Sequence, residues 1–443
     1  MSTVTSIRRP TAGTLETLLT SQPLLPTSRW PWINMLRAEA VNRLDMLSLP
    51  TTRDEEWRFT DISPLTKLWF APALGASTLE TADIAHFYIE ETSTKLVFVD
   101  GVYAPQLSST IIDSDLVVSN LPAILATHAT VIETHLGRHA TFNDNVFSAL
   151  NTAFLHDAAV IIVPCNVAAA APIHLLFITT QKEVVSNPRC LVVAETGSAV
   201  TLIEDYVALC QAGGQEANYF TNALTEIALE DNARVNHIRI QREGVQAFHI
   251  ANCAVSLGCS SNYQSVSVAL GAQISRYNLN LLLAEGAECA VDGLALIGAN
   301  QLADTHTCID HAQPHGVSRQ LHKCIVGCSA HAVFNGKIMV RQGAQRTDSV
   351  QSSRNLLLNR RAHVDTKPQL EIFADDVKCA HGATIGQLDS EAVFYLQSRG
   401  LSDSVARNLL TYAFGAEIIE RIPVASLKHQ LEQMVLEQTS SQS

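Results

Sequence analysis

The feature that most constrains the fold is a long series of short β-branched runs beginning near Lys95. The runs have the length and composition of strands, and they read LVFVD, AVIIVP, IHLLFITT, CLVVAE, AVTLIEDYV, VNHIRIQ, SVSVAL and YNLNLLL. Short turn-then-strand units recur between them at uneven separations of roughly thirty residues, at Gly197, Asp231, Gly286, Gly327 and Arg361. Because no segment of helical period interrupts the series, we expect a β-solenoid or sandwich and not a doubly wound α/β sheet.

Alternation within the runs predicts which faces are buried. In SVSVAL, Val266, Val268 and Leu270 share one face of a strand, and the small residues between them take the other. We expect the Val266 face to be covered.

Helical patterns flank this β region. At the N-terminal side, the spacing of leucines from Leu15 to Leu44 is helical, with prolines punctuating it. A charged and aromatic stretch from Thr51 to Leu65 follows and is expected to be a connector, in which Trp57 is a packing anchor.

The helical period returns after His381. Asp389 and Gly400 bracket SEAVFYLQSR as an N-cap and a C-terminal glycine, and Ser402 opens a second helix that Pro423 stops. The predicted apolar stripe of this second helix is Val405, Leu409, Tyr412, Ala416 and Ile419. The predicted organisation is an N-terminal helical region with its connector (1–90), a β core (91–387), a C-terminal helical domain (388–437) and a disordered tail (438–443).

Charge and composition exclude several classes of function. Thirty basic against 43 acidic residues give a net charge of −13, and without a basic stripe we expect no nucleic-acid partner. No uninterrupted 18-residue apolar run is present, so we expect no membrane span. The first residues lack the apolar region of a signal peptide, which predicts a cytoplasmic protein whose 10 cysteines are free thiols.

Common catalytic motifs are absent from the sequence. Gly336 and Lys337 are followed by Ile338, so they do not form a phosphate-binding loop. The sequence also lacks a G-x-S-x-G elbow, an H-E-x-x-H helix and paired C-x-x-C motifs. We therefore expect a protein that is neither an ATPase of the P-loop class nor an ordinary hydrolase.

Two groups of residues are candidates for metal chemistry, and the first lies between Thr305 and His331. Its members are His306, Cys308, His311, His315, His322, Cys324, Cys328 and His331. On a strand, His306 shares a face with Cys308, and His322 with Cys324, as metal ligands require. The alternative is that these are ordinary strand residues, since no four have the loop spacing of a structural zinc site.

The second candidate is Cys379 with His381. If extended, the two side chains project to the same side with Cβ atoms about 6.5–7 Å apart. This separation is too wide for one zinc ion without a bend, but a multi-iron cluster can use each residue on a different iron. Two ligands do not complete such a cluster, so the others must come from elsewhere in the chain or from another subunit.

A long stretch around this pair resembles a known family. The segments Lys367–Gly400 (KPQLEIFADDVKCAHGATIGQLDSEAVFYLQSRG) and Val333–Leu358 resemble the SufB/SufD family of the SUF iron–sulfur cluster assembly system, and within it the SufD group. The similarity is dense from Pro314 to Arg421 and collinear over the rest, including the EEWRFTD connector. The SufB pattern differs, because it has Glu in place of the Gly that follows the His.

The resemblance implies a right-handed parallel β-helix core flanked by N-terminal and C-terminal α-helical domains, serving as a non-catalytic scaffold. It implies pairing with a SufB-like subunit through the β-helices and binding of a SufC-like ABC ATPase, the source of ATP, through the C-terminal helices. It implies that Cys379 and His381 contribute to a nascent iron–sulfur cluster at the SufB interface. The candidate partner-binding residues are Leu388, Phe394, Tyr395, Leu396, Arg399, Leu409, Tyr412 and Phe414.

Three other functions compete with this interpretation. A β-solenoid enzyme acting on polysaccharide would need an exposed carboxylate or aromatic groove. A stable metal-binding protein would use the histidines and cysteines of residues 305–331. A purely structural subunit would stabilise SufB and recruit SufC without touching iron. An uncovered solenoid edge would also allow a homodimer of the isolated chain.

Overall fold

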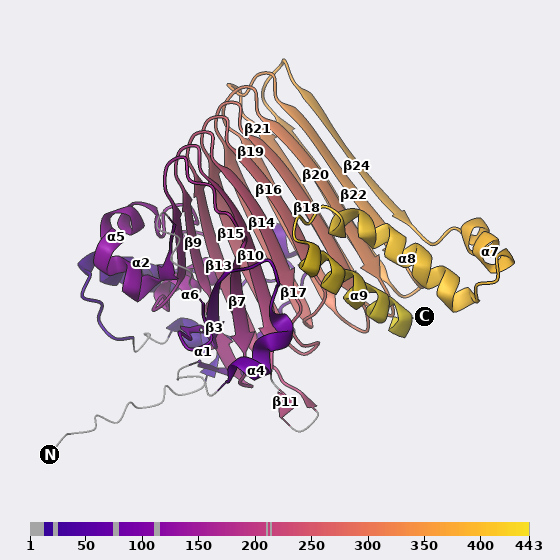
Figure 1. Cartoon of the computed structure of the whole chain (residues 1–443), viewed down its shortest axis with the longest axis horizontal. Helices are drawn as coiled ribbons and strands as arrows, with labels where there is room; N and C mark the ends of the chain where they lie inside the picture. The colour runs from indigo at the N-terminus through magenta and orange to yellow at the C-terminus, as the bar shows by residue number, and fades with distance from the viewer. Residues whose placement is uncertain are drawn as a thin grey trace.

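The body of the protein is a β-solenoid of about 8 turns with helices at both ends, as the sequence predicted (Figure 1). The computed structural model describes residues 13–20, 25–73, 79–109, 116–209, 211–212 and 215–442. Along the solenoid, successive strands alternate between two sheets, one twelve-stranded and one ten-stranded, and pair in parallel with the strand of the next turn.

Each sheet gathers strands from one side of every turn. The twelve-stranded sheet contains β1 (Gly13–Thr14), β2 (Trp69–Pro72), β5 (Val117–Asn120), β6 (Ala159–Val163), β8 (Val184–Ser186), β9 (Arg189–Ala194), β13 (Phe220–Leu229), β15 (Phe248–Leu257), β17 (Ile274–Leu283), β19 (Leu302–His311), β21 (His331–Val340) and β23 (His363–Ile372). The ten-stranded sheet contains β3 (Thr94–Val99), β4 (Val102–Tyr103), β7 (Ile173–Thr179), β10 (Ala199–Ala208), β14 (Arg234–Gln241), β16 (Asn262–Ala269), β18 (Glu288–Ile297), β20 (Val317–Val326), β22 (Asp348–Leu357) and β24 (Lys378–Gly386). A separate hairpin joins β11 (Gln211–Ala212) to β12 (Gln215–Glu216).

The turns between strands differ in length, which accounts for the uneven spacing of the turn-then-strand units in the sequence. Each reverses the chain within a few residues, and many use a residue with positive φ, such as Asn232 (60°), Ser260 (54°) and Cys328 (52°). Asparagine and glycine accept this left-handed backbone most readily, so the turn units were visible in the sequence. Turns of different length leave the pairing in register, because the strands themselves set the ladder.

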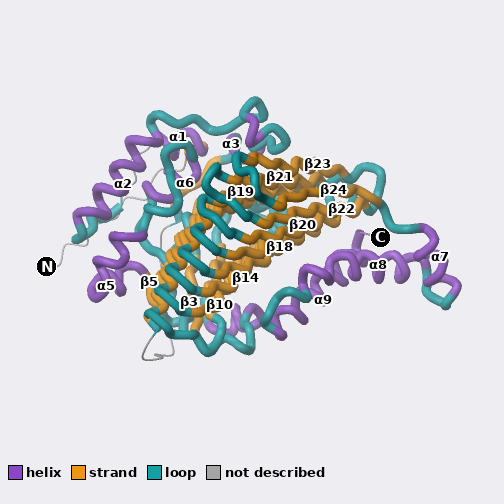
Figure 2. Tube along the Cα trace, turned by 90° about the horizontal axis from the view of Figure 1, so that it is seen from above, coloured by secondary structure: helices purple, strands orange, loops and turns teal. Residues whose placement is uncertain are grey.

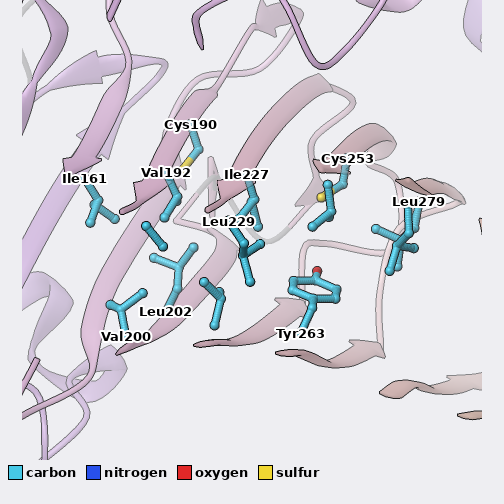
Figure 3. Close-up of a cluster of buried hydrophobic side chains, with 14 of the residues drawn as sticks. Ile161, Cys190, Val192, Val200, Leu202, Ile227, Leu229, Cys253, Tyr263 and Leu279 are labelled. Carbon is cyan, nitrogen blue, oxygen red and sulfur yellow. The ribbon is translucent and has the colours of Figure 1, made fainter. Parts of the chain in front are cut away.

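Apolar side chains of successive turns stack between the two sheets (Figure 3). Leu202, Ile227, Tyr263 and Leu279 belong to this core and are each at most 2% exposed. In parallel ladders, inward residues of neighbouring turns lie directly above one another, so one row of large side chains supports the next.

The outer face of the ten-stranded sheet is covered by C-terminal helices (Figure 1). Val266, Val268 and Leu270 are buried there, as predicted, but they pack among residues of α8 (Asp403–Ile419) and α9 (Ala425–Gln442) and not inside the solenoid. The buried residues of α8 are Ala406, Thr411, Gly415, Ile418 and Ile419.

The predicted apolar stripe of α8 was wrong in its N-terminal part, whereas Tyr412 packs against the covering cluster and Ile419 is buried. Val405 and Leu409 are 51% and 44% exposed, whereas Ala406 and Gly415 are buried. A Cβ at Gly415 would stand 3.3 Å from Ile325, so a small residue allows the helix to approach the sheet closely. The small residues on this side allow the helix to lie close against the ten-stranded sheet.

Most of the other described helices lie at the N-terminal end or project from the C-terminal end, but Glu55–Trp57 lies along the later turns, where Glu55 pairs with Lys367 of β23. These other helices are α1 (Leu15–Thr20), α2 (Pro31–Leu44), η1 (Glu55–Trp57), α3 (Ser63–Thr66), α4 (Thr81–Ile84), η2 (Ala85–Phe87), α5 (Leu121–His135), α6 (Val146–Ala153) and α7 (Ser390–Ser398). Asp389 and Ser402 cap α7 and α8 as predicted, and Gly400 has a positive φ of 96°.

Helices α5 and α6 contradict the expectation that no helix interrupts the β region. Every residue of α6 is buried, including the polar Ser148, Asn151 and Thr152 on one side of the helix. The side chain of Asn145 caps this helix by accepting hydrogen bonds from the backbone N–H groups of Phe147 and Ser148. The helix is only 8 residues long and lies between β-branched runs, so it was not separated from them in the sequence.

The predicted disordered tail from residue 438 is helical as far as Gln442, where the described residues end. The Gln438 side chain donates a hydrogen bond to the carbonyl of Leu270 at 3.1 Å, and Thr439 is buried. The contact of Gln438 with the sheet and that of Thr439 with Asn408 on α8 hold a polar segment that local sequence alone would leave unstructured. Among the described helices, none combines the length and hydropathy needed to cross a bilayer.

Candidate functional site

Cys379 and His381 lie at the start of β24, the last strand of the ten-stranded sheet. Cys379 pairs with Ser349 and His381 with Gln351, both of which are at most 1% exposed. The two candidate residues therefore point toward the interior of the solenoid, side by side on one face, as their spacing predicted. Cys379 also packs against a buried cluster that contains Ile338 and Val340.

Beneath this pair, the solenoid interior is polar. The Ser349 and Ser318 hydroxyls are 2.7 Å apart, and the Ser318 hydroxyl is 2.9 Å from Nε2 of His311. The Gln351 amide donates to Gln320 at 2.8 Å. Each turn near this end thus contributes hydrogen-bonding side chains directly below Cys379 and His381.

The environment of Cys379 favours the neutral thiol. Burial and the nearby carboxylate of Asp348 raise the pKa of Cys379. A metal ion binds the thiolate, so ligation here would release a proton. Among the described residues, no third histidine, cysteine or carboxylate joins this pair in a three-ligand group.

Both sheets end beside this pair without a further strand. Within the described residues, β24 pairs only with β22 and β23 only with β21, so each is an edge strand. Ile372, Phe373 and Ile385 are 39%, 63% and 50% exposed at this end. Unpaired edges with exposed apolar side chains are sites at which another chain can add to a sheet.

The C-terminal helices present some of the candidate partner residues and turn others inward. Helix α7 projects beyond the end of the solenoid, at the opposite end from α2 and α5 (Figure 2). On it, Phe394 and Tyr395 are 71% and 57% exposed. Arg399 is exposed beside Tyr395, and Leu388 and Leu396 are half-buried.

The candidate partner-binding residues of α8 differ in their exposure to solvent. Leu409 is exposed, but Tyr412 and Phe414 are half-buried against the cluster that covers the ten-stranded sheet. The Phe414 carbonyl accepts a hydrogen bond from Lys323 at 2.8 Å, and the Lys323 ammonium lies 4.4 Å from the Phe414 ring centroid.

The histidines and cysteines of residues 305–331 do not form one site. His306 and Cys308 line an outer groove, whereas His322 and Cys324 are buried on the ten-stranded sheet, where Nδ1 and Sγ are 3.6 Å apart. Burial lowers the pKa of His322 to about 4 and raises that of Cys324 to about 12. His315 and Cys328 occupy turns with positive φ.

The outer groove of about 550 Å³ lies between the N-terminal connector and the twelve-stranded sheet. Trp57 lines it, packs on Phe147 with ring centroids 5.5 Å apart, and lies beneath the Arg276 guanidinium, which confirms its role as an anchor. Nε2 of His306 is 3.0 Å from the buried Asp304 carboxylate. Burial opposes protonation of His306, but Asp304 outweighs it and raises the pKa of His306.

Sequence reasoning missed one cluster of ligand-type residues. His331 belonged to the predicted group, but its neighbours in space are His363 and Asp365, which lie in the next turn of the twelve-stranded sheet. The H-x-D spacing of His363 and Asp365 was visible in the sequence. They lie next to His331 only because of the register in which β21 and β23 pair. The turns of this solenoid differ in length, so the sequence does not show that register.

Comparison with known proteins identifies the family. Residues 177–414 match the model described as "SUF system FeS cluster assembly, SufBD core domain", and residues 17–175 match "SufBD protein N-terminal region". The chain is 43% identical to an iron–sulfur cluster assembly SufBD family protein of Synechocystis sp., covering 90% of this chain and 89% of the relative. It is 33% identical to the iron–sulfur cluster assembly protein SufD of Escherichia coli, covering 90% and 94%.

A chloroplastic protein of Arabidopsis thaliana is 32% identical over 94% of this chain and 88% of its own length. The two family models together span the N-terminal helices, the solenoid and the start of the C-terminal helices. The resemblance noted in the sequence is thereby confirmed, and the chain belongs to the SufBD family of SUF-system iron–sulfur cluster assembly proteins.

Proposed function

We propose that this chain is a non-catalytic scaffold subunit that pairs end to end with a SufB-type subunit and contributes Cys379 and His381 to a nascent iron–sulfur cluster. The observation that carries the proposal is the position of these two side chains at the open end of the solenoid, between two edge strands. A partner that continues both sheets would enclose them and add the missing ligands.

The ligand set suits a cluster that must be built and released. Cys379 is half-buried and His381 exposed, so both are accessible before the partner docks. A mixed thiolate and imidazole site divided between two chains is more exchangeable than a closed four-thiolate site. In this proposal, iron and sulfide are the material that the complex assembles and passes on. We expect this assembly to take place in the cytoplasm, as the sequence predicts.

The test is anaerobic co-purification with SufB-type and SufC-type partners, followed by measurement of iron and sulfide per complex. Cys379→Ser and His381→Ala should assemble normal amounts of complex with much less cluster. Cys259→Ser is the matched control, because Cys259 is an exposed cysteine in a turn between two strands. If all variants carry the wild-type amount of cluster, the subunit is purely structural.

The end-to-end pairing has its own test. Phe373→Asp places a charge on the exposed apolar edge, where Phe373 is 63% exposed, and should abolish co-purification of the SufB-type subunit. Met46→Asp is the control, because Met46 is 76% exposed in the N-terminal region. Equal recovery of the partner with both variants would show that the pairing uses another surface.

We further propose that α7 and the exposed side of α8 bind a SufC-type ATPase. Phe394 and Tyr395 are the most exposed aromatic residues of the C-terminal helices, and an apolar surface of this kind suits a partner protein. Phe394→Ala with Tyr395→Ala should remove the ATPase subunit from the complex and leave the SufB-type subunit bound. Retention of the ATPase subunit would contradict this assignment.

A further inference from the structure

Three ligand-type side chains from two neighbouring strands meet on the twelve-stranded sheet. His331 and His363 are the first residues of β21 and β23 and pair directly across the ladder, and Asp365 follows two residues after His363. Oδ2 of Asp365 is 2.8 Å from Nε2 of His331 and 3.1 Å from Nε2 of His363. One ligand atom from each residue lies within 4.8 Å of the other two.

The backbone holds the three side chains on the outer face. Ala332 and Val364, the residues that alternate with them, belong to a buried alanine-rich cluster. Because side chains alternate along a strand, their neighbours must point outward. Cys379 lies beyond the other end of β23 and faces the interior, so this group is separate from the proposed cluster site.

Solvent can reach all three side chains. Their exposed fractions are 25% for His331, 64% for His363 and 26% for Asp365. Exposed ion pairs contribute little to stability, so stability alone gives little reason for two imidazoles to share one carboxylate. Two imidazoles and one carboxylate with open positions are instead a ligand set typical of divalent first-row transition metals.

The distances fit a single ion. Bonds of about 2.0–2.2 Å from metal to nitrogen or oxygen place neighbouring ligand atoms about 3.0–3.5 Å apart. The two nitrogen-to-oxygen distances are close to that range, and a small opening of the side chains would admit the ion. Magnesium and calcium are poor candidates, because they prefer sites made of oxygen ligands.

We propose that His331, His363 and Asp365 bind one divalent first-row transition-metal ion, ferrous iron or zinc, through Nε2 of both imidazoles and a carboxylate oxygen. Three protein ligands leave positions for water, so the bound ion is exchangeable. The proposal does not depend on Cys379 and His381 or on any partner subunit.

The experiment is titration of the chelator-stripped full chain under anaerobic conditions with Co²⁺, followed by its visible absorption, and with Fe²⁺ and Zn²⁺ in separate competition arms. The variants are His363→Ala and Asp365→Asn. The second variant keeps the size of the side chain and guards against a folding defect, which circular dichroism would reveal. The control is the double variant Cys379→Ser with His381→Ala, which removes the other candidate ligands.

The expected result is one Co²⁺ per chain without a thiolate charge-transfer band, displaced by Fe²⁺ or Zn²⁺ but not by Mg²⁺. Each ligand variant should weaken Co²⁺ binding by about 10–100-fold or more. Loss of a residue that only supports a metal ligand already lowers metal affinity by about this factor, and these variants remove a ligand itself. The control variant should bind as the wild type does. Wild-type affinity in both ligand variants, or loss of binding only in the control, would overturn the proposal.

Discussion

A buried ion pair joins the N-terminal helices to the solenoid, and its disruption should be costly. Arg189 on β9 and Glu226 on β13 are 2.5 Å apart with both side chains fully buried. The Glu226 carboxylate also accepts backbone hydrogen bonds from Gly137, His139 and Ala140, in the loop that follows α5. Burial would raise the pKa of Glu226, but Arg189 and these N–H groups outweigh it and hold the pKa below its usual value.

The expected cost of Glu226→Gln follows from these contacts. The single amide oxygen can accept either from His139 and Ala140 or from Gly137, and the Arg189 guanidinium is left as a buried charge without a counter-ion. Breaking a buried pair in this way costs about 3–5 kcal/mol of the free energy of unfolding. Adding Arg189→Met should restore part of the loss, because no uncompensated charge then remains.

The assay is urea unfolding followed by tryptophan fluorescence and far-ultraviolet circular dichroism. The 4 tryptophans all lie before residue 70, so fluorescence reports on the N-terminal region and circular dichroism reports mainly on the solenoid. Arg407→Gln, which breaks an exposed pair with Asp403 on α8, is the control and should cost about 0.5 kcal/mol or less. A loss below about 1 kcal/mol for Glu226→Gln, or a larger loss in the double variant, would refute the reasoning.

Three further predictions concern the solenoid interior. A Cβ at Gly293 would stand 2.5 Å from the His322 ring, so Gly293→Ala should lower the free energy of unfolding by about 1–3 kcal/mol in urea titration. Gly343→Ala is the control and should be nearly neutral, because no atom lies within 4 Å of a Cβ at Gly343. Since burial lowers the pKa of His322 to about 4, the unfolded chain binds the proton first, and stability should fall by about 1.4 kcal/mol per unit as pH drops from about 6.5 toward 4. The loss between pH 7 and pH 5 should therefore be about 2 kcal/mol smaller in His322→Gln, and an equal loss would contradict a neutral buried imidazole. Iodoacetamide should label exposed Cys259 in the native protein well before buried Cys324, as peptide mass spectrometry would show, and equal rates would mean that the interior opens readily.

The sequence pattern predicted that Cys379 and His381 share one face of a strand but not what surrounds them. The spacing of Cys379 and His381 was enough to place them on one face, because alternation is a local property of any strand. That this face is the interior, at an open end, depends on where β24 docks. The incorrect prediction for the buried side of α8 has the same origin. Which side of that helix is buried depends on how the helix packs against the sheet.

By itself, the sequence determined the features that depend on a few neighbouring residues. The strand runs, the turn units, the caps at Asp389 and Ser402 and the lack of a phosphate-binding loop are of this kind. Only the tertiary structure decided which distant residues meet. His331 reaches His363 and Asp365 through parallel pairing across a turn of variable length, and no local pattern records which register that turn produces.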